Sequence, residues 1–397
     1  MTQQQTNSKR ILALDILRGI TIAGMILVNN PGSWGHIYAP LRHAEWNGLT
    51  PTDLVFPFFM FIMGISTYIS LKKYNFTYSH ATLRKILRRT VVIFIIGMAI
   101  GWFSRFCYYW SSAPDDLSFG QNLWASVWTF DRMRILGVMQ RLALCYCAAS
   151  IVALTMKHSR IPYLIATLLV GYFVLLMCGN GFAYNETNIL SVVDRAVLTP
   201  AHMYKDNGID PEGLLSTIPS IAHVLLGFCV GRMMLGDKKA ASRSREEVLQ
   251  SHLVKLFLVG TILTFSGLLL SYGCPLNKKI WSPTFVLTTC GLASSLLALL
   301  IWIIDVKGYK RWSLFFESFG VNPLFMYVLG GVLGILFGSI HLPWGDGSIS
   351  IHGLLYDKIM QPIFGDTGGS LIYALVFVAI NWCIGYQLYK RKIYIKI

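Results

Sequence analysis

The sequence predicts an all-α, polytopic membrane protein, on the strength of its composition, its apolar runs and the placement of its charges. Of 397 residues, 54% are hydrophobic and 13% are charged, whereas a soluble domain carries roughly a quarter charged residues. Apolar runs close to the ~20 residues that a helix needs to cross a bilayer recur along the chain. Lipid offers backbone groups no water partner, so we expect helices; the alternating pattern of barrel strands is absent.

About ten of these runs are expected to be transmembrane helices, within a single domain that covers 1–397. They lie at 12–30, 53–72, 88–108, 134–156, 161–179, 216–236, 253–272, 284–304, 314–340 and 370–389. The ninth run is the least regular, because glycines crowd its second half. Residues 351–365 are expected to form an interfacial or re-entrant segment.

The basic residues predict which side of the membrane each connection faces. The chain has 34 Lys and Arg against 19 Asp and Glu, which gives a formal net charge of +15. Most of the 34 fall at the N-terminus, in 72–90, 156–160, 232–255 and 305–311, and in the C-terminal tail. An even number of helices puts these segments on one side, so the positive-inside rule places both termini in the cytoplasm. This distribution explains the basic charge without a nucleic-acid partner.

The remaining connections are expected to face outside. They are 31–52, 109–133, 180–215, 273–283 and 341–369, which are long and rich in Trp, Asn, Asp, Gly and Tyr. Chemistry on an external polar substrate would use these loops. The eight cysteines are scattered, mostly inside apolar runs, and their spacing predicts neither a disulfide framework nor a metal site.

Ionisable residues inside apolar runs are candidates for function, because a charge at bilayer depth needs a partner or a cavity. Asp15 and Arg18 lie three residues apart in the first helix, on one face, and could simply pair. Gln140 and Arg141 are expected well inside the fourth helix. Arg141 has no carboxylate in its own helix, which makes it the better candidate for an anionic ligand.

The stretch 41–64 contains a histidine directly before a membrane helix. Thr50 and Pro51 are suited to the N-cap and first position of that helix, and Asp53 falls in its first turn. Histidine titrates near neutral pH, so His43 could deprotonate an amine or a hydroxyl. On chemistry alone it competes with the other outer histidines. These are His36, His202, His341 and His352.

Seven segments, in order along nearly the whole chain, carry recognisable motifs. The longest is HAEWNGLTPTDLVFPFFMFIMG at 43–64. The others are LDILRGITIAGMILVNN (14–30), DRMRILGVMQRLALCY (131–146), DPEGLLSTIPSIAHVLLG (210–227), NKKIWSPTFVLTTC (277–290), DVKGY (305–309) and KRKIYIKI (390–397). In these segments the chain resembles the heparan-alpha-glucosaminide N-acetyltransferase family and its bacterial relatives.

The resemblance implies a transmembrane acyltransferase that moves acetyl from cytosolic acetyl-CoA to the terminal glucosamine of a glycan, as in heparan sulfate, across the membrane. It aligns His43 with the family's active histidine and Asn29 with an asparagine implicated beside it. It also implies a homodimer and, for a bacterial member, a multi-pass protein of the inner (cytoplasmic) membrane. No metal is expected.

Acetyl-CoA carries phosphates, so a basic cytoplasmic mouth is expected, with a tunnel for the pantetheine arm. The candidate cofactor-binding residues are Asp15, Arg18, Lys85, Arg88, Arg89, Gln140 and Arg141. Asp15 would orient Arg18, and the pair Gln140–Arg141 would line the tunnel. For the cluster of basic residues at 84–89, the positive-inside bias is an equally good explanation.

The acceptor, an amino sugar or glycosaminoglycan fragment, should be bound by the outer loops. The candidates are Trp46, Asn47, Asp131, Asp210, Glu212 and Trp281. For 210–213 the Pro and Gly residues also fit a simple turn before a helix.

The sequence leaves the mechanism and the acceptor open. His43 could act as a base for direct transfer, with Asn29 donating to the oxyanion, or could carry the acetyl group itself. An O-acetyltransferase of an envelope glycan, an enzyme acting on a free amino sugar, or a sugar transporter without acyl transfer would be alternative functions. Transport is weakened because no inverted repeat is evident.

Overall fold

The computed structural model describes residues 11–112, 114, 117–204, 206–236, 244–345 and 347–395. The first ten residues, part of the 232–255 connection and the last two residues of the tail, all expected in the cytoplasm, lie outside the described residues. The long helices are α1 (Leu12–Asn29), α2 (Pro51–Lys72), α3 (His80–Ser111), α5 (Val138–Thr155), α6 (Ile161–Cys178), α8 (Thr217–Leu235), α9 (Arg245–Leu270), α10 (Pro283–Leu300), α12 (Pro323–Ser339) and α14 (Gln361–Lys390).

Shorter elements fill the connections. They are η1 (Ala39–Leu41), α4 (Phe119–Val127), η2 (Phe130–Arg132), α7 (Ile189–Leu198), η3 (Pro200–His202), the π-helical η5 (Ile301–Val306), η6 (Arg311–Ser313), α11 (Leu314–Val321), α13 (Ile351–Gly353) and the π-helical η7 (Leu354–Met360). An antiparallel hairpin of β1 (His341–Trp344) and β2 (Gly347–Ser350) is the one sheet in the described part of the chain.

The all-α polytopic membrane class is confirmed. Among the described residues, nine helices are long and apolar enough to cross a membrane. A tenth crossing results if Arg311–Val321 and Pro323–Ser339, which meet at 81°, count as one bent span. The irregular ninth run is therefore a broken helix, and its break falls at Asn322, directly before a proline that disfavours helical backbone in the residue preceding it.

Several predicted boundaries are wrong because a cap or a stretch of extended backbone, rather than hydropathy, sets where the helix begins. The helix expected at 88–108 begins at His80, since the Ser79 hydroxyl accepts a hydrogen bond from the Thr82 amide (3.1 Å). The helix expected at 134–156 begins only at Val138, after extended backbone at Gly137. The fourth predicted helix is therefore shorter at its start than expected.

The predicted segment 351–365 is helical. It comprises α13, η7 and the first residues of α14, and it ends at Gly365, whose φ of 73° interrupts the helix. Ile359, Ile363 and Phe364 are exposed on it. An exposed apolar surface of this kind suits the interfacial placement, one of the two that the sequence leaves open beside a re-entrant segment.

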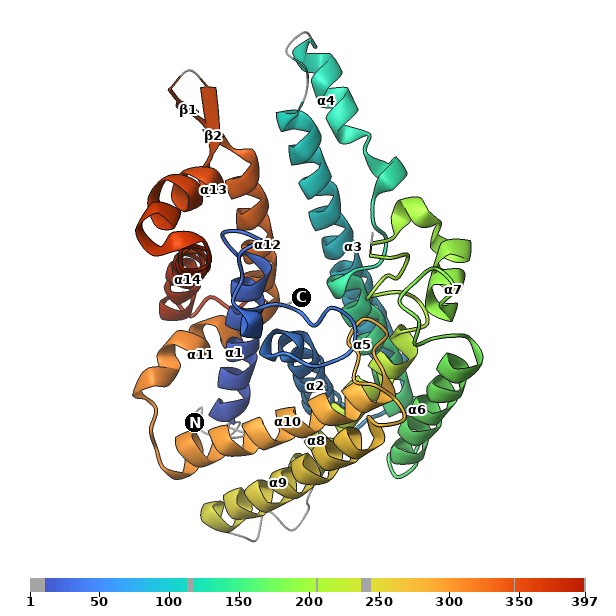
Figure 1. The fold of residues 1–397 in the computed structure, drawn as a ribbon. Coiled ribbons are helices and arrows are strands. Elements are labelled where there is room, and N and C mark those ends of the chain that lie inside the picture. Colours follow the sequence, from blue (N-terminus) through green and yellow to red (C-terminus); the bar gives the residue numbers. More distant parts are fainter. Residues whose placement is uncertain are drawn as a thin grey trace.

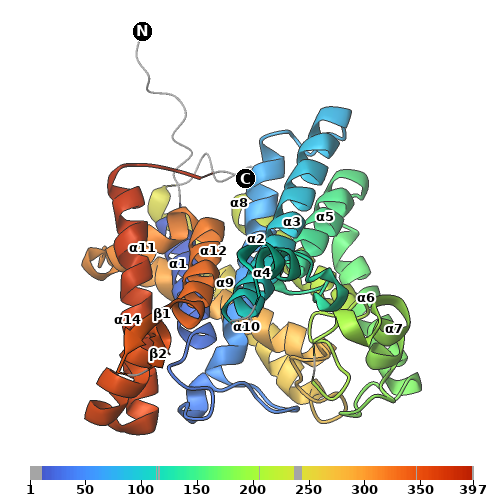
Figure 2. The same ribbon diagram turned by 90° about the horizontal axis from the view of Figure 1, so that it is seen from above.

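The helices divide into two groups with α2 between them. In Figures 1 and 2, α1 lies with α11, α12 and α14, while α3, α5 and α6 lie on the other side. Helix α8 packs on α2 and also contacts α5 and α6. Helices α9 and α10 run side by side along the lower edge of Figure 1. Helices α2 and α8 approach backbone to backbone: a Cβ on Gly64 would lie 2.1 Å from the Val224 carbonyl oxygen, and one on Gly227 2.1 Å from that of Phe61.

The connections 30–50, 180–188, 199–216 and 271–282 meet at one end of the bundle, which we call the histidine face. Gly48 donates its amide to the Leu276 carbonyl (2.8 Å), and the Trp46 indole donates to that of Phe182 (3.0 Å). The connections 73–79 and 156–160 lie at the opposite end, which we call the basic face. The loop that carries the histidine motif is thus fixed by loops distant in sequence.

Candidate active site

His43 and Asp53 form a hydrogen-bonded pair on the histidine face. Asp53 is the third residue of α2, and its Oδ1 atom lies 2.7 Å from Nδ1 of His43. Its Oδ2 atom accepts from the Ala44 amide (3.1 Å), the Thr50 amide (3.2 Å) and the Thr50 hydroxyl (2.9 Å). The capping box that starts α2 therefore also holds the carboxylate against the imidazole.

This pairing decides which nitrogen of His43 is available for chemistry. A carboxylate surrounded by donors acts as an acceptor, so the hydrogen between the two residues belongs to Nδ1. Nε2 then has the free lone pair, as in the base of a hydrolase triad. The Asp53 side chain is 1% exposed and the His43 side chain 43%, so the base is accessible while its partner is buried.

A cavity of about 540 Å³ opens beside His43, and we call it the charged cavity. It is bounded by α1, α2, α5, α12 and the loops of the histidine face. Its ionisable lining residues are Arg42, His43, Glu45, Asp53, Arg134, Asp206, Glu212, Lys278 and Lys279. Asn29, the last residue of α1, also lines it. The two predicted catalytic residues, Asn29 and His43, therefore share one cavity.

A second cavity of about 540 Å³ adjoins the first, and we call it the neutral cavity. It lies between α1, α3, α12, α13 and α14, and both cavities are lined by Met25, Asn29, Trp34 and Tyr327. Its wall includes backbone of Gly101, Gly330, Gly331 and Gly334. None of the described residues that line it is Asp, Glu, Lys or Arg. Asn29 thus lies where a charged compartment meets an uncharged one.

Arg134 joins the wall of the charged cavity to the turn before α8. Its guanidinium bonds the carboxylates of Asp210 and Glu212 and lies 4.8 Å from the centre of the Tyr204 ring. Burial alone would lower the pKa of Arg134, but the two carboxylates outweigh it and raise that pKa. Burial has the opposite effect on Glu212 and would raise its pKa, but the charge of Arg134 outweighs burial and the pKa of Glu212 is lowered. Arg134 and Glu212 are therefore both held in their charged forms.

A third cavity, of about 500 Å³, lies at the basic face between α2, α3 and α5, and we call it the basic cavity. Lys85, Arg88 and Arg89 line it. Lys85 lies 3.3 Å from the Tyr74 hydroxyl, and Arg89 lies 4.8 Å from the centre of the Tyr146 ring. None of its described lining residues is acidic, so its charge is suited to an anion.

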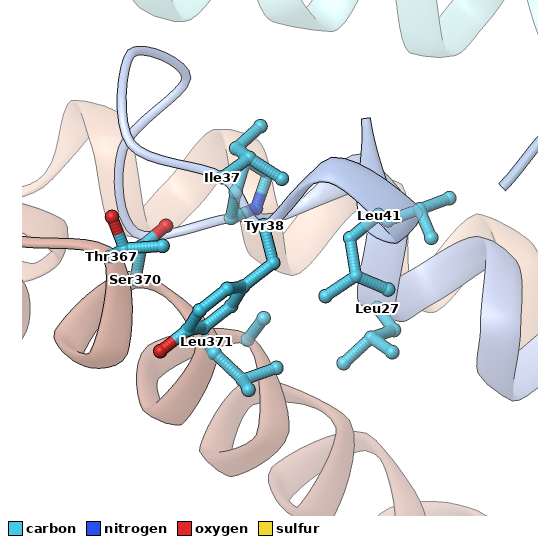
Figure 3. A pocket seen from close by; sticks show the side chains of 10 residues that line it. Leu27, Ile37, Tyr38, Leu41, Thr367, Ser370 and Leu371 are labelled. Carbon is cyan, nitrogen blue, oxygen red and sulfur yellow. The ribbon is translucent and has the colours of Figure 1, made fainter. Parts of the chain in front are cut away.

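The small cavity in Figure 3 has a different character. It measures about 20 Å³, which is room for roughly one water, and it lies between α1, η1 and α14 beside Leu27, Tyr38 and Leu371. Next to it, the Ser33 amide donates to Ser370 Oγ (3.0 Å). This contact anchors the start of the 30–50 connection, which carries His43, on α14.

The family model described as "Heparan-alpha-glucosaminide N-acetyltransferase, catalytic" matches residues 10–265. The chain belongs to this family. Human and mouse proteins named "Heparan-alpha-glucosaminide N-acetyltransferase" are similar to it. The human protein is 28% identical over 372 residues, covering 80% of this chain and 52% of the relative. The mouse protein is 25% identical over 447 residues, covering 99% and 61%. The chain thus spans about half to three fifths of these relatives' length.

The heparan-alpha-glucosaminide N-acetyltransferase match includes both predicted catalytic residues and Asp53, whereas Lys278 and Tyr327 lie beyond its end at residue 265. Asp53 was predicted only as part of a helix start. An acidic residue in the first turn of a predicted membrane helix, shortly after a loop histidine, is the sequence signal that could have identified it.

Of the six predicted acceptor-binding residues, Glu212 lines the charged cavity and Asp210 lies directly behind it, holding Arg134. Trp46 stacks on Tyr184 at 4.5 Å, and Asn47 accepts a hydrogen bond from Asn277 (3.2 Å), so both connect loops. The two remaining residues lie away from the cavity lining. Asp131 is exposed beside Arg132, and Trp281 is completely buried.

The predicted cofactor-binding residues fall into separate places. Lys85 and Arg89 share the basic cavity. Asp15 and Arg18 form the expected ion pair (2.9 Å), and Arg18 also donates to the Ser66 hydroxyl (2.8 Å) between α1 and α2. This pair is outside the lining of the basic cavity.

Gln140 and Arg141 lie in the first turn of α5 rather than well inside the helix, because α5 starts late. The Arg141 guanidinium donates to the Gly213 carbonyl (3.2 Å) and lies 5.2 Å from the centre of the Trp281 ring. Gln140 packs against Gly97 of α3, where a Cβ would lie 2.7 Å from its Oε1. Neither residue is part of the lining of the three large cavities.

Proposed function

We propose that this protein is a transmembrane N-acetyltransferase that moves acetyl from acetyl-CoA to the amino group of a terminal glucosamine on the histidine face. The observation that carries the proposal is the His43–Asp53 pair, which leaves Nε2 free at a cavity that also contains Asn29. A glucosamine ammonium is not nucleophilic, so a base of this kind is required. Family membership supports the same reaction.

In the proposed reaction, Nε2 of His43 removes a proton from the amine, whose nitrogen attacks the thioester carbonyl carbon. The Asn29 amide donates to the oxyanion that develops on the carbonyl oxygen. The C–N bond forms, the C–S bond breaks, and the thiolate of CoA takes up the proton held by His43. The second proton lost by the original ammonium group is released to solvent. Asp53 stabilises the imidazolium during the transfer and keeps the ring in one tautomer.

We assign the amino sugar to the charged cavity. Glu45, Asp206 and Glu212 line it and suit an ammonium and sugar hydroxyls, and the loops around it belong to the histidine face. Because the charge distribution predicts that this face is external, the acceptor would reach His43 without crossing the membrane.

We assign the uncharged pantetheine arm to the neutral cavity and the phosphates of CoA to the basic cavity. Helix α3 contributes to both, through Arg89 in the basic cavity and Ile100 in the neutral one. These residues are about 17 Å apart along the helix axis at roughly 1.5 Å per residue. The donor would thus approach Asn29 from the basic face, which we place in the cytoplasm of a bacterial cell. The homodimer implied by the family resemblance is part of the same proposal.

The test is thiol release by the purified protein in proteoliposomes with acetyl-CoA and a panel of acceptors. The panel comprises glucosamine, glucosaminides and de-N-sulfated heparin fragments, each paired with its N-acetylated form as a control. We expect thiol release with free amines and none with N-acetylated partners. Equal release with both would point to hydroxyl acetylation, and sugar uptake without thiol release would point to transport; either result would overturn the proposal.

A further inference from the structure

Lys278 is held beside the His43–Asp53 pair by a hydrogen-bonded turn. It lies between α9 and α10, in a turn where Asn277 donates its side-chain amide to Asn47 (3.2 Å) and Trp281 donates its backbone amide to the Lys278 carbonyl (3.0 Å). The Lys278 side chain is 18% exposed. The lysine is therefore fixed by the same loop contacts that hold the histidine motif.

The ammonium of Lys278 touches both members of the pair. Nζ lies 3.5 Å from Oδ1 of Asp53 and 3.2 Å from Nδ1 of His43. Since Nδ1 gives its hydrogen to Asp53, Lys278 meets the ring as a neighbouring positive charge. Burial lowers the pKa of Lys278, and the charges of Asp53 and Glu212 offset this effect only in part. Among the described residues, Lys278 is the one cation within hydrogen-bonding distance of the imidazole.

Lys278 differs from two other cations near His43 in the carboxylate with which it pairs. Those that line the same cavity are Arg42, Glu45, Arg134, Asp206, Glu212 and Lys279. Arg134 is bound by two carboxylates, and Lys279 lies 2.7 Å from Asp206. Carboxylates away from the histidine thus offset the charges of Arg134 and Lys279, whereas Lys278 pairs with Asp53, the carboxylate that also binds His43.

An unopposed carboxylate would favour the imidazolium form, which cannot accept a proton from an amine. A cation in contact with both groups offsets that carboxylate. We propose that Lys278 is a positioning residue that acts through His43, in the acetyl transfer proposed above. Together with Asp53 it fixes the ring and offsets the charge of the carboxylate, so that the imidazole meets the amine unprotonated.

The direct test measures the rate at which diethyl pyrocarbonate modifies His43, by peptide mass spectrometry across a pH series. This reagent reacts with unprotonated imidazole, so its pH dependence reports the charge of His43 without any acceptor. We expect Lys278→Met to move the midpoint of the profile to higher pH by about one unit, because a like charge is removed. Lys278→Arg, which keeps the charge, is expected to retain the wild-type midpoint.

Lys279→Met is the matched control. It removes the same charge from the neighbouring position, which contacts Tyr184 and Asp206 rather than His43, so its midpoint should stay in place. The inference is overturned if Lys278→Met keeps the wild-type midpoint, or if both variants shift it equally. Apparent melting temperatures exclude a variant that has merely unfolded.

The acid limb of kcat/KM for acetyl transfer gives a second readout and should move with the modification profile. If the wild-type protein transfers no acetyl group, the proposed function fails while the modification profile still tests Lys278. If transfer is normal and neither profile moves in Lys278→Met, the role of Lys278 fails alone.

Discussion

The Asp53 carboxylate, buried in the first turn of α2, lies 2.7 Å from Nδ1 of His43. The same carboxylate caps the helix by accepting from the Thr50 amide and hydroxyl. One side chain therefore sets both where α2 begins and how the imidazole is turned.

Replacing Asp53 with Asn tests its part in this arrangement. Asn keeps the size of the side chain but removes the charge that orients Nδ1–H, so we expect kcat to fall by about 10²–10⁴-fold with smaller changes in KM. Steady-state kinetics measures this, and Thr50→Ser, which keeps the capping hydroxyl, serves as the control. Wild-type kcat in Asp53→Asn would contradict the role.

Gly101 offers a way to block the neutral cavity without disturbing the fold. A Cβ at Gly101 would meet no atom within 4 Å, and the residue lines the cavity. Gly101→Leu should therefore raise the KM for acetyl-CoA by roughly tenfold, or about 1.4 kcal/mol, and leave the KM for the amino sugar unchanged. Gly338→Leu is the matched control, because Gly338 also has open space and is outside the lining. A selective rise in the acceptor KM would reverse our assignment of the cavities.

Arg134 and Arg132 are predicted to differ in their effect on stability although they are two residues apart. Arg134→Met leaves two buried carboxylates unpaired, and removing one partner of such a group costs about 3–5 kcal/mol. Arg132→Met removes an exposed side chain whose pair with Asp131 contributes about 1 kcal/mol or less. Apparent melting temperatures in detergent compare the two variants. Equal losses of melting temperature in the two variants would show that the buried pairing of Arg134 adds little to stability.

Asp194 predicts a pH dependence of stability. Burial raises its pKa to about 6; a hydrogen bond from the Leu214 amide opposes that rise, and the charge of Asp210 adds to it. The folded protein then holds this proton more tightly than the unfolded chain does. The contribution of Asp194 to stability is therefore greatest at low pH and falls as pH rises from about 4 to about 6.

Asp194→Asn removes this dependence. The apparent melting temperature of the variant minus that of the wild type, measured in the same detergent, should increase from pH 4.5 to pH 7. A difference that does not change with pH, or that changes in the opposite direction, would contradict the prediction.

Much of the fold could be predicted because lipid restricts the chain to helices of known length and charge bias. The pairing of Asp15 with Arg18 followed from their spacing on one helix. The break at Asn322 carried a local signal in Pro323, but the bend also depends on the tail, since the Asn322 amide group bonds the Ile393 carbonyl and the Ile395 amide, each at 2.8 Å. Hydropathy does not report such tertiary contacts.

The candidate site could be predicted only where a local sequence motif marks it. The motif around His43 identified the histidine and, through the resemblance, Asn29. Lys278 lies 235 residues further along the chain and reaches His43 only through loop packing. The glycines of α12 indicated an irregular helix, but their place in the wall of a cavity depends on α3, which no local pattern specifies.

The most direct test of the account is single-turnover transfer of radiolabelled acetyl from acetyl-CoA to a glucosaminide by the His43→Ala variant. His36→Ala is the control, because His36 is an exposed histidine of the same loop outside the cavity linings. We expect His36→Ala to transfer acetyl at the wild-type rate and His43→Ala to lose at least about 10²-fold. Wild-type transfer by His43→Ala would contradict both the base and the acetyl-carrier mechanisms.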